Sequence, residues 1–184
     1  MKGLWIRNAN VYLPDRVLTG GSVYAAGGRI ARICGPEDGS PAKPDDADEV
    51  WDAEGLSIVP GFVDVHVHGG GGADVMDAAE DDEAIGRIAR FHALHGTTSF
   101  LATTMTAPRN ELERAVDGVV RAMERGVAAG GAEVLGLHLE GPFLNPRRCG
   151  AQNPALIRPF DRDEMEDLLA RGRGAVRLVT LAPE

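Results

Sequence analysis

The sequence predicts a mixed α/β protein in which a small β unit precedes a parallel sheet. The first observation is that residues 1–58 consist of short β-branched and apolar runs separated by turn residues. The second is that, from residue 59 onward, four apolar runs of strand length alternate with runs of helical periodicity. This alternation is typical of parallel strands with helices outside them. Four such units fit either an open sheet or the first half of an eight-stranded barrel.

The N-terminal β unit is expected to be incomplete by itself. Its extended runs cover residues 4–13, 21–34 and 49–61, with a polar loop rich in Pro, Gly and Asp at 35–48. So few strands leave open edges and bury a modest apolar area. Trp5 and Trp51 are expected to form part of its core.

The second part of the chain has the pattern of repeated β/α units. Strands are predicted at 59–66, 97–104, 133–139 and 175–182, and helices at 81–95, 108–129 and 161–171. Asp161 is the expected N-cap of the last helix. The strands are nearly all apolar, which predicts burial on both faces.

Two histidines follow the first of these strands and are the leading candidates for metal ligands. His66 and His68 are two positions apart, so in a strand their side chains point to the same face and can reach one divalent ion. Gly69–Gly72 follow and leave room for an ion or ligand. The alternative is a pair of hydrogen-bonded histidines at a sheet edge, which the apolar strand and the glycine run make less favoured. Asp64, on the same face, is expected to orient one imidazole.

A carboxylate ends the third strand. Glu140 would be costly to bury unless it were paired, hydrogen-bonded or bound to a metal. His138, two residues earlier, is expected on the same face. The active site of a (β/α)8 barrel lies at the carboxyl ends of its strands. Glu140 is therefore expected to meet His66 and His68, although an ordinary ion pair at a strand end is the alternative.

The loop that follows Glu140 contains Arg147, Arg148 and Cys149. Arginines suit bidentate phosphate binding, but exposed loop arginines are at least as good an interpretation. Cys149 has no adjacent base in the sequence, which argues against a nucleophilic role.

Composition excludes some function classes. The chain carries 19 basic and 28 acidic side chains, a formal net charge of −9, without a basic cluster. It is therefore a poor candidate for binding nucleic acid. No run has the length of a signal peptide or a membrane span, and the two cysteines form no CxxC pattern, so a cytoplasmic protein without membrane contact is expected.

Four segments together resemble one enzyme family. They are "PGFVDVHVHGGGG" (60–72), "GTTSFLATTMT" (96–106), "GLHLEGPFLNPRRCGAQNP" (136–154) and "LVTLAPE" (178–184). The chain resembles the N-acetylglucosamine-6-phosphate deacetylase family of the amidohydrolase superfamily. The Pro-Gly-x-x-Asp-x-His-x-His segment marks the superfamily, while "HLEGPF" and "TLAPE" are more specific to the family. The resemblance runs through essentially the whole chain, which corresponds to about the first half of such an enzyme.

The resemblance implies a fold and an activity. The fold is the first half of a (β/α)8 TIM-type barrel, residues 59–184, preceded by part of a small β-sandwich domain, residues 1–58. The activity is hydrolysis of a linear amide: N-acetylglucosamine-6-phosphate gives glucosamine-6-phosphate and acetate. The substrate is thus a small amino-sugar phosphate, and the full-length protein is expected to be a homodimer.

The resemblance also implies roles for named residues. Glu140 matches the family's carboxylate metal ligand, and His66 and His68 match a pair that some members use for a second metal. The cofactor is one or two divalent ions, zinc or alternatively iron. Ala151 and Gln152 match loop positions that contact the sugar. The catalytic aspartate is expected beyond Glu184, so the 184-residue chain alone is expected to be inactive.

Two other functions stay open at this point. One is an amidohydrolase that acts on a cyclic amide. The segment "HLEGPF" argues against this function, because it lacks the strand-end lysine that a carbamylated two-metal site needs. The other is a truncated, non-catalytic paralogue that acts as a binding or assembly module.

Overall fold

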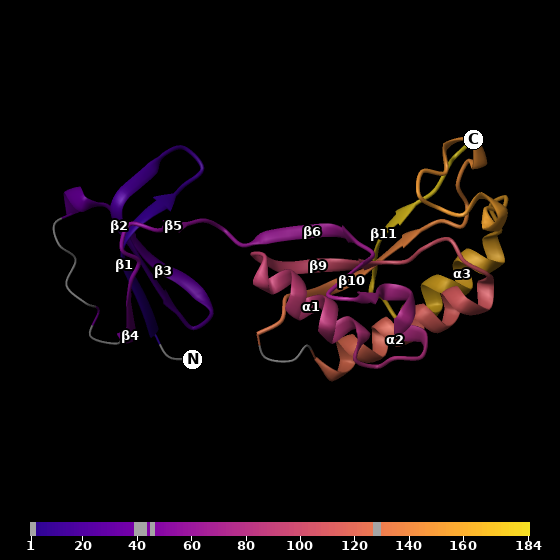
Figure 1. The fold of residues 1–184 in the computed structure, drawn as a ribbon, viewed down its shortest axis with the longest axis horizontal. Helices are drawn as coiled ribbons and strands as arrows, with labels where there is room; N and C mark the ends of the chain where they lie inside the picture. The colour runs from indigo at the N-terminus through magenta and orange to yellow at the C-terminus, as the bar shows by residue number, and fades with distance from the viewer. Residues whose placement is uncertain (1–2, 39–43, 45–46, 127–129) are drawn as a thin grey trace. The chain divides into compact units, whose positions relative to one another are not determined.

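The protein folds into two compact units, Met1–Pro60 and Gly61–Glu184 (Figure 1). The structure is a computed structural model and describes residues 3–38, 44, 47–126 and 130–184. It confirms the fold class: an N-terminal β-sheet is followed by a parallel sheet that forms half of a barrel.

The first unit is a five-stranded sheet in the order β3-β2-β1-β4, with β5 also pairing with β1. Its hairpin between β2 and β3 turns through Gly27 and Gly28, which both have positive φ, as a tight two-residue turn requires. A small core of Ala9, Val11, Leu18 and Val23 lies on this sheet. The strands are β1 (Gly3–Tyr12), β2 (Val17–Ala26), β3 (Arg29–Cys34), β4 (Ala47–Asp52) and β5 (Ser57–Ile58), and η1 (Pro36–Asp38) is a short 3₁₀ helix.

The two tryptophans of this unit differ from one another. Trp5 is buried, as expected, but the prediction for Trp51 is wrong because that side chain is 53 % exposed. Trp51 pairs in register with Ile6, the neighbour of Trp5. Neighbouring strand residues point to opposite faces, so Trp51 does not share the buried face with Trp5. Its indole N–H donates to Glu49 Oε1 at 2.7 Å.

The second unit has a four-stranded parallel sheet in the order β11-β10-β9-β6, with its helices packed beside it (Figure 1). The predicted alternation is confirmed. The strands are β6 (Phe62–Val67), β9 (Thr97–Thr103), β10 (Glu133–Glu140) and β11 (Val176–Thr180), and the helices are α1 (Ala84–Leu94), α2 (Arg109–Arg125) and α3 (Arg162–Arg171). Between β6 and α1 lie β7 (Gly69–Gly70), β8 (Ala73–Asp74) and the 3₁₀ helix η2 (Val75–Ala79).

The helix ends follow local sequence chemistry. Asp161 is the N-cap of α3, as predicted, and its carboxylate accepts a hydrogen bond from the Glu164 N–H at 2.9 Å. Helix α2 ends at Arg125, because Gly126 takes a positive φ of 78°. The predicted continuation of this helix over 127–129 lies outside the described residues.

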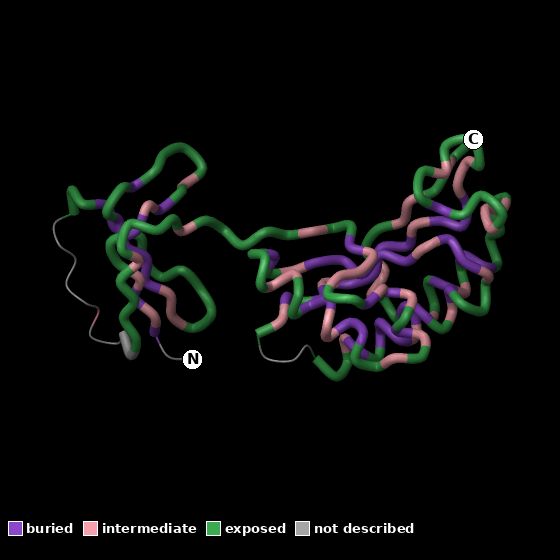
Figure 2. The backbone as a smooth tube through the Cα atoms, in the orientation of Figure 1, coloured by how far each residue is buried: buried purple, intermediate pink, exposed green. Residues whose placement is uncertain are grey.

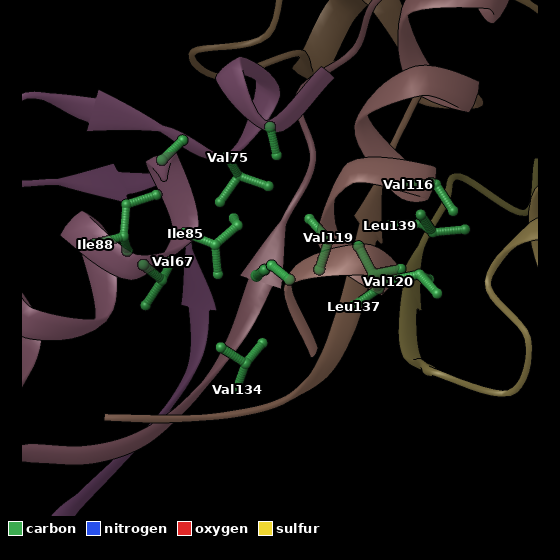
Figure 3. Close-up of a cluster of buried hydrophobic side chains, with 14 of the residues drawn as sticks. Val67, Val75, Ile85, Ile88, Val116, Val119, Val120, Val134, Leu137 and Leu139 are labelled. Atoms are coloured by element: carbon green, nitrogen blue, oxygen red, sulfur yellow. The ribbon is translucent and has the colours of Figure 1, made fainter. Parts of the chain in front are cut away.

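One apolar core fills the space between the parallel sheet and its helices (Figure 3). Phe100 and Leu137 of the central strands are fully buried. The helices contribute a continuous apolar face to the same cluster: Ile85, Ile88, Leu112, Val116, Val119, Val120 and Leu168.

Strand β6 departs from the expected burial. Phe62, Val63 and Val65 are exposed, and Val67 is the buried residue of this strand (Figure 2). The reason is its place at the end of the strand order, where it pairs with β9 on one side. An apolar run predicts burial from residue type, whereas the neighbours that cover it depend on the sheet order. None of the helices in the described part of the chain combines the length and the apolar character that spanning a membrane requires.

Two helical glycines give a test of this packing. A methyl group at Gly118 of α2 would lie 1.9 Å from the Ala78 carbonyl oxygen of η2. Gly118→Ala is therefore expected to lower the free energy of unfolding by about 2 kcal/mol through overpacking, although alanine favours helix. Urea unfolding followed by circular dichroism measures this.

The matched control is Gly86→Ala in α1. There the nearest atom to the added methyl is Arg90 Nη1 at 3.4 Å, the end of a flexible side chain. In this variant the free energy of unfolding is expected to rise by about 1 kcal/mol, because alanine has a higher helix propensity than glycine. Equal effects of the two substitutions would contradict the packing of α2 against η2.

Candidate metal centre

Three predicted side chains meet at the carboxyl ends of the parallel strands. One ligand atom from each of His66, His68 and Glu140 lies within 4.8 Å of the others. His68 Nε2 is 3.0 Å from Glu140 Oε2 and His66 Nε2 is 3.6 Å from it. The two Nε2 atoms are 3.1 Å apart. The structure thus brings together His66 and Glu140, which are 74 positions apart in the sequence.

The sheet order explains why they meet. β6 and β10 flank β9, so the ends of the histidine strand and the glutamate strand lie on either side of Thr103. The Val67 N–H donates to Thr103 Oγ1 at 2.9 Å. This bond joins the end of β6 to the end of β9 between the two histidines.

The backbone also sets the tautomer of His68. Its Nδ1 is 3.1 Å from the Thr103 carbonyl oxygen. A carbonyl accepts only, so Nδ1 carries the hydrogen and donates it. In a neutral ring, Nε2 then keeps its lone pair and is free to bind a cation. Thr103 lies at the end of the second predicted strand, a position where the sequence indicates chemistry, but its bond to His68 was not predicted.

Asp64 lies differently from expectation. Its Oδ1 accepts a hydrogen bond from the His66 main-chain N–H at 3.0 Å, so it fixes the backbone and not the imidazole ring. The pairing of β6 with β9 shifts register between Asp64 and Val67. This irregularity changes which groups face each other and could not be read from alternation in the sequence.

His138 lies beside the site, but both of its ring nitrogens are occupied by hydrogen bonds. Its Nδ1 donates to the Val65 carbonyl at 3.0 Å, and its Nε2 accepts from the Thr180 hydroxyl at 2.8 Å. Its ring stands edge-on to that of His66, with centroids 5.0 Å apart. Burial lowers the pKa of His138, and the neighbouring His66 lowers it further, against an opposing effect of the Val65 bond. A neutral His138 on β10 therefore connects its strand to β6 through Val65 and to β11 through Thr180.

The loop after β10, residues 141–161, covers one side of Glu140. Gln152 is buried and donates from Nε2 to Glu140 Oε2 at 2.6 Å. Ala151 is exposed beside it. The family resemblance implies sugar contacts for both residues, and the bond between Gln152 and Glu140 was not predicted. Arg147 and Arg148 are exposed, which agrees with their interpretation as solvent-exposed loop arginines.

Another arginine attaches this loop to the rest of the unit. Arg158 forms a two-bond ion pair with the buried Glu164 of α3, with Nε 3.0 Å from Oε2. Its Nη1 also donates to the Ala107 carbonyl at 3.0 Å. The loop is therefore tied to α3 and to the segment after β9.

The donor set fits a divalent transition metal. Two imidazole nitrogens and one carboxylate oxygen are ligands that zinc and iron accept, and three protein ligands leave positions open. Glu140 is mostly buried, with 19 % of its side chain exposed. An ion here would offset the cost of placing a carboxylate in a partly buried position.

Comparison with known proteins decides the family. The amidohydrolase family model matches residues 57–184. The chain belongs to the amidohydrolase family. Within it, the chain is a homologue of N-acetylglucosamine-6-phosphate deacetylases: it is 35 % identical over 189 residues to the Bacillus subtilis protein of that name, covering 100 % of the chain and 45 % of the relative.

Other relatives agree with this placement. The chain is 41 % identical over 127 residues to an N-acetylgalactosamine-6-phosphate deacetylase of Escherichia coli O157:H7, covering 69 % of the chain and 33 % of the relative. The structure of a mutant Mycobacterium smegmatis N-acetyl-D-glucosamine-6-phosphate deacetylase in complex with N-acetyl-D-glucosamine-6-phosphate matches with a TM-score of 0.81 and 34 % identity. That match covers 100 % of this chain and 44 % of the other. The chain thus spans less than half the length of these relatives.

Removal of the carboxylate tests the centre. In Glu140→Gln, the anionic ligand is replaced by a neutral amide of the same size, so affinity for Zn²⁺ or Co²⁺ is expected to fall by ~100-fold or more. Isothermal titration calorimetry of the 184-residue chain measures it. Glu133→Gln, the same change at the exposed start of β10, is the control and is expected to leave affinity unchanged. Tight binding by Glu140→Gln would exclude Glu140 as a ligand.

Proposed function

We propose that this chain is part of a metal-dependent deacetylase that converts N-acetylglucosamine-6-phosphate to glucosamine-6-phosphate and acetate. The observation that carries the proposal is the convergence of His66, His68 and Glu140 at the carboxyl ends of parallel strands. Relatives named for this reaction support the choice of substrate.

In the proposal these three residues hold one divalent ion, zinc or alternatively iron, and a second ion is compatible with the family resemblance. When bound, such an ion polarises an amide carbonyl and lowers the pKa of water. Thr103 keeps the Nε2 lone pair of His68 directed to the ion through its bond to Nδ1. His138, neutral and fully hydrogen-bonded, adds no positive charge beside the ion.

The proposal assigns the sugar to the side of the centre formed by the loop 141–161. Ala151 is exposed there and can contact a ligand directly, next to Gln152. The base that takes the proton from water is proposed to be an aspartate outside these 184 residues.

A second substrate is favoured by one specific observation. The Escherichia coli relative with 41 % identity carries the name of an N-acetylgalactosamine-6-phosphate deacetylase. The two sugars differ only in configuration at C4, whereas the acetamide that is cleaved is on C2 in both. The same centre can therefore serve either sugar, and both belong in the test.

A hybrid enzyme tests the function. The chain replaces the matching N-terminal part of the Bacillus subtilis relative, and acetate release from each sugar phosphate is measured by a coupled assay. We expect acetate from at least one sugar, because the hybrid completes the barrel around His66, His68 and Glu140. The same hybrid with Glu140→Gln is expected to fall to the level of the blank.

The 184-residue chain alone is the second comparison and is expected to release no acetate, since the proposed base is outside it. A hybrid that folds by circular dichroism and binds zinc, yet releases acetate from neither sugar, would overturn the proposed function.

A further inference from the structure

The carboxamide of Gln152 is held by two short hydrogen bonds. Its side chain is 4 % exposed. Its Oε1 accepts from the Thr106 main-chain N–H at 2.6 Å, and its Nε2 donates to Glu140 Oε2 at 2.6 Å. A backbone N–H only donates and a carboxylate only accepts, so these partners allow a single orientation of the amide.

The oxygen that Gln152 contacts is the one that faces the histidines. Glu140 Oε2 is 3.0 Å from His68 Nε2 and 3.6 Å from His66 Nε2. A carboxylate oxygen has two lone pairs, so the bond from Gln152 occupies one direction and leaves the other toward the histidines. Because the amide is neutral, it orients the carboxylate without competing in charge with a cation.

Thr106, whose main-chain N–H donates to Gln152, belongs to a tightly packed segment. A methyl group built on Gly141, the residue after Glu140, would lie 2.2 Å from Thr106 Oγ1. The backbone after β10 therefore lies directly against Thr106. The loop that carries Gln152 is also fixed further along, where Arg158 Nη1 donates to the Ala107 carbonyl. The loop therefore contacts the segment after β9 both before Gln152, at Gly141, and after it, at Arg158.

We infer that Gln152 is a positioning residue for the metal centre: it holds the Glu140 carboxylate in the orientation that meets His66 and His68. This inference rests on the proposed role of Glu140 as a ligand. It gives Gln152 a function that does not need a sugar to be present. It also makes the loop 141–161 part of the metal centre's support as well as a wall of the substrate side.

Cobalt binding to the 184-residue chain, without any sugar, tests the inference. Gln152→Leu keeps an apolar body of similar size and deletes both bonds, so Co²⁺ affinity is expected to fall by about 10- to 100-fold. The visible absorption spectrum of bound Co²⁺ is expected to change as well, because it reports ligand arrangement. A general loss of stability would leave the spectrum of the bound ion unchanged.

Two further variants complete the design. Asn153→Leu removes the neighbouring amide, which accepts from the Ala155 N–H at 3.0 Å and does not touch Glu140; it is expected to keep the wild-type affinity and spectrum. Gln152→Asn, which is too short to keep both bonds, is expected to show an intermediate loss and serves if Gln152→Leu does not fold by circular dichroism.

The outcomes separate this inference from the proposed function. If Glu140→Gln abolishes Co²⁺ binding while the folded Gln152 variants keep wild-type affinity and spectrum, the positioning role is wrong and the metal site stands. If Glu140→Gln binds Co²⁺ like the wild type, the metal site itself is wrong and the role of Gln152 falls with it.

Discussion

The site depends on one constraint: the end of β9 holds the ends of β6 and β10 on either side of it. Thr103 and the following Thr104 join the two sides. The Thr103 hydroxyl accepts from the Val67 N–H and its carbonyl from His68 Nδ1, while the main-chain N–H of Thr104 donates to the His138 carbonyl at 3.0 Å. Parallel strands present their carboxyl ends at one edge of a sheet, so the residues at the end of the middle strand can set the positions of side chains from both neighbours.

Three of the buried polar side chains around the candidate metal centre have hydrogen-bond partners. His138, Gln152 and Thr103 are all buried, and each uses its donors and acceptors on a backbone group, a hydroxyl or Glu140. Buried polar groups are costly when they lack partners, so such a network favours one arrangement of the strands over its alternatives. The outcome is a rigid support on which His66, His68 and Glu140 are the groups left facing one another.

In the proposed function, the loop 141–161 supports the metal ligand Glu140 and also borders the substrate. It follows directly from Glu140, returns to Glu140 through Gln152, and is fastened at its far end by the pair of Arg158 and Glu164. Breaking a buried ion pair on one side leaves an uncompensated charge, so this fastening resists local opening. Exposed positions such as Ala151 are thereby carried on a well-supported loop, which suits contact with a ligand.

The order of strands and helices, the cap at Asp161, and the places of His66, His68 and Glu140 at strand ends could all be predicted from the amino-acid sequence. These depend on local periodicity and on chemistry within a few residues, which a sequence displays directly. The folded structure was needed to show that Gln152 donates to Glu140, that Asp64 accepts from a main-chain N–H, and that Trp51 and the start of β6 are exposed. Such partners depend on register shifts and on which strand lies beside which, and these are distances through space between residues far apart in the chain.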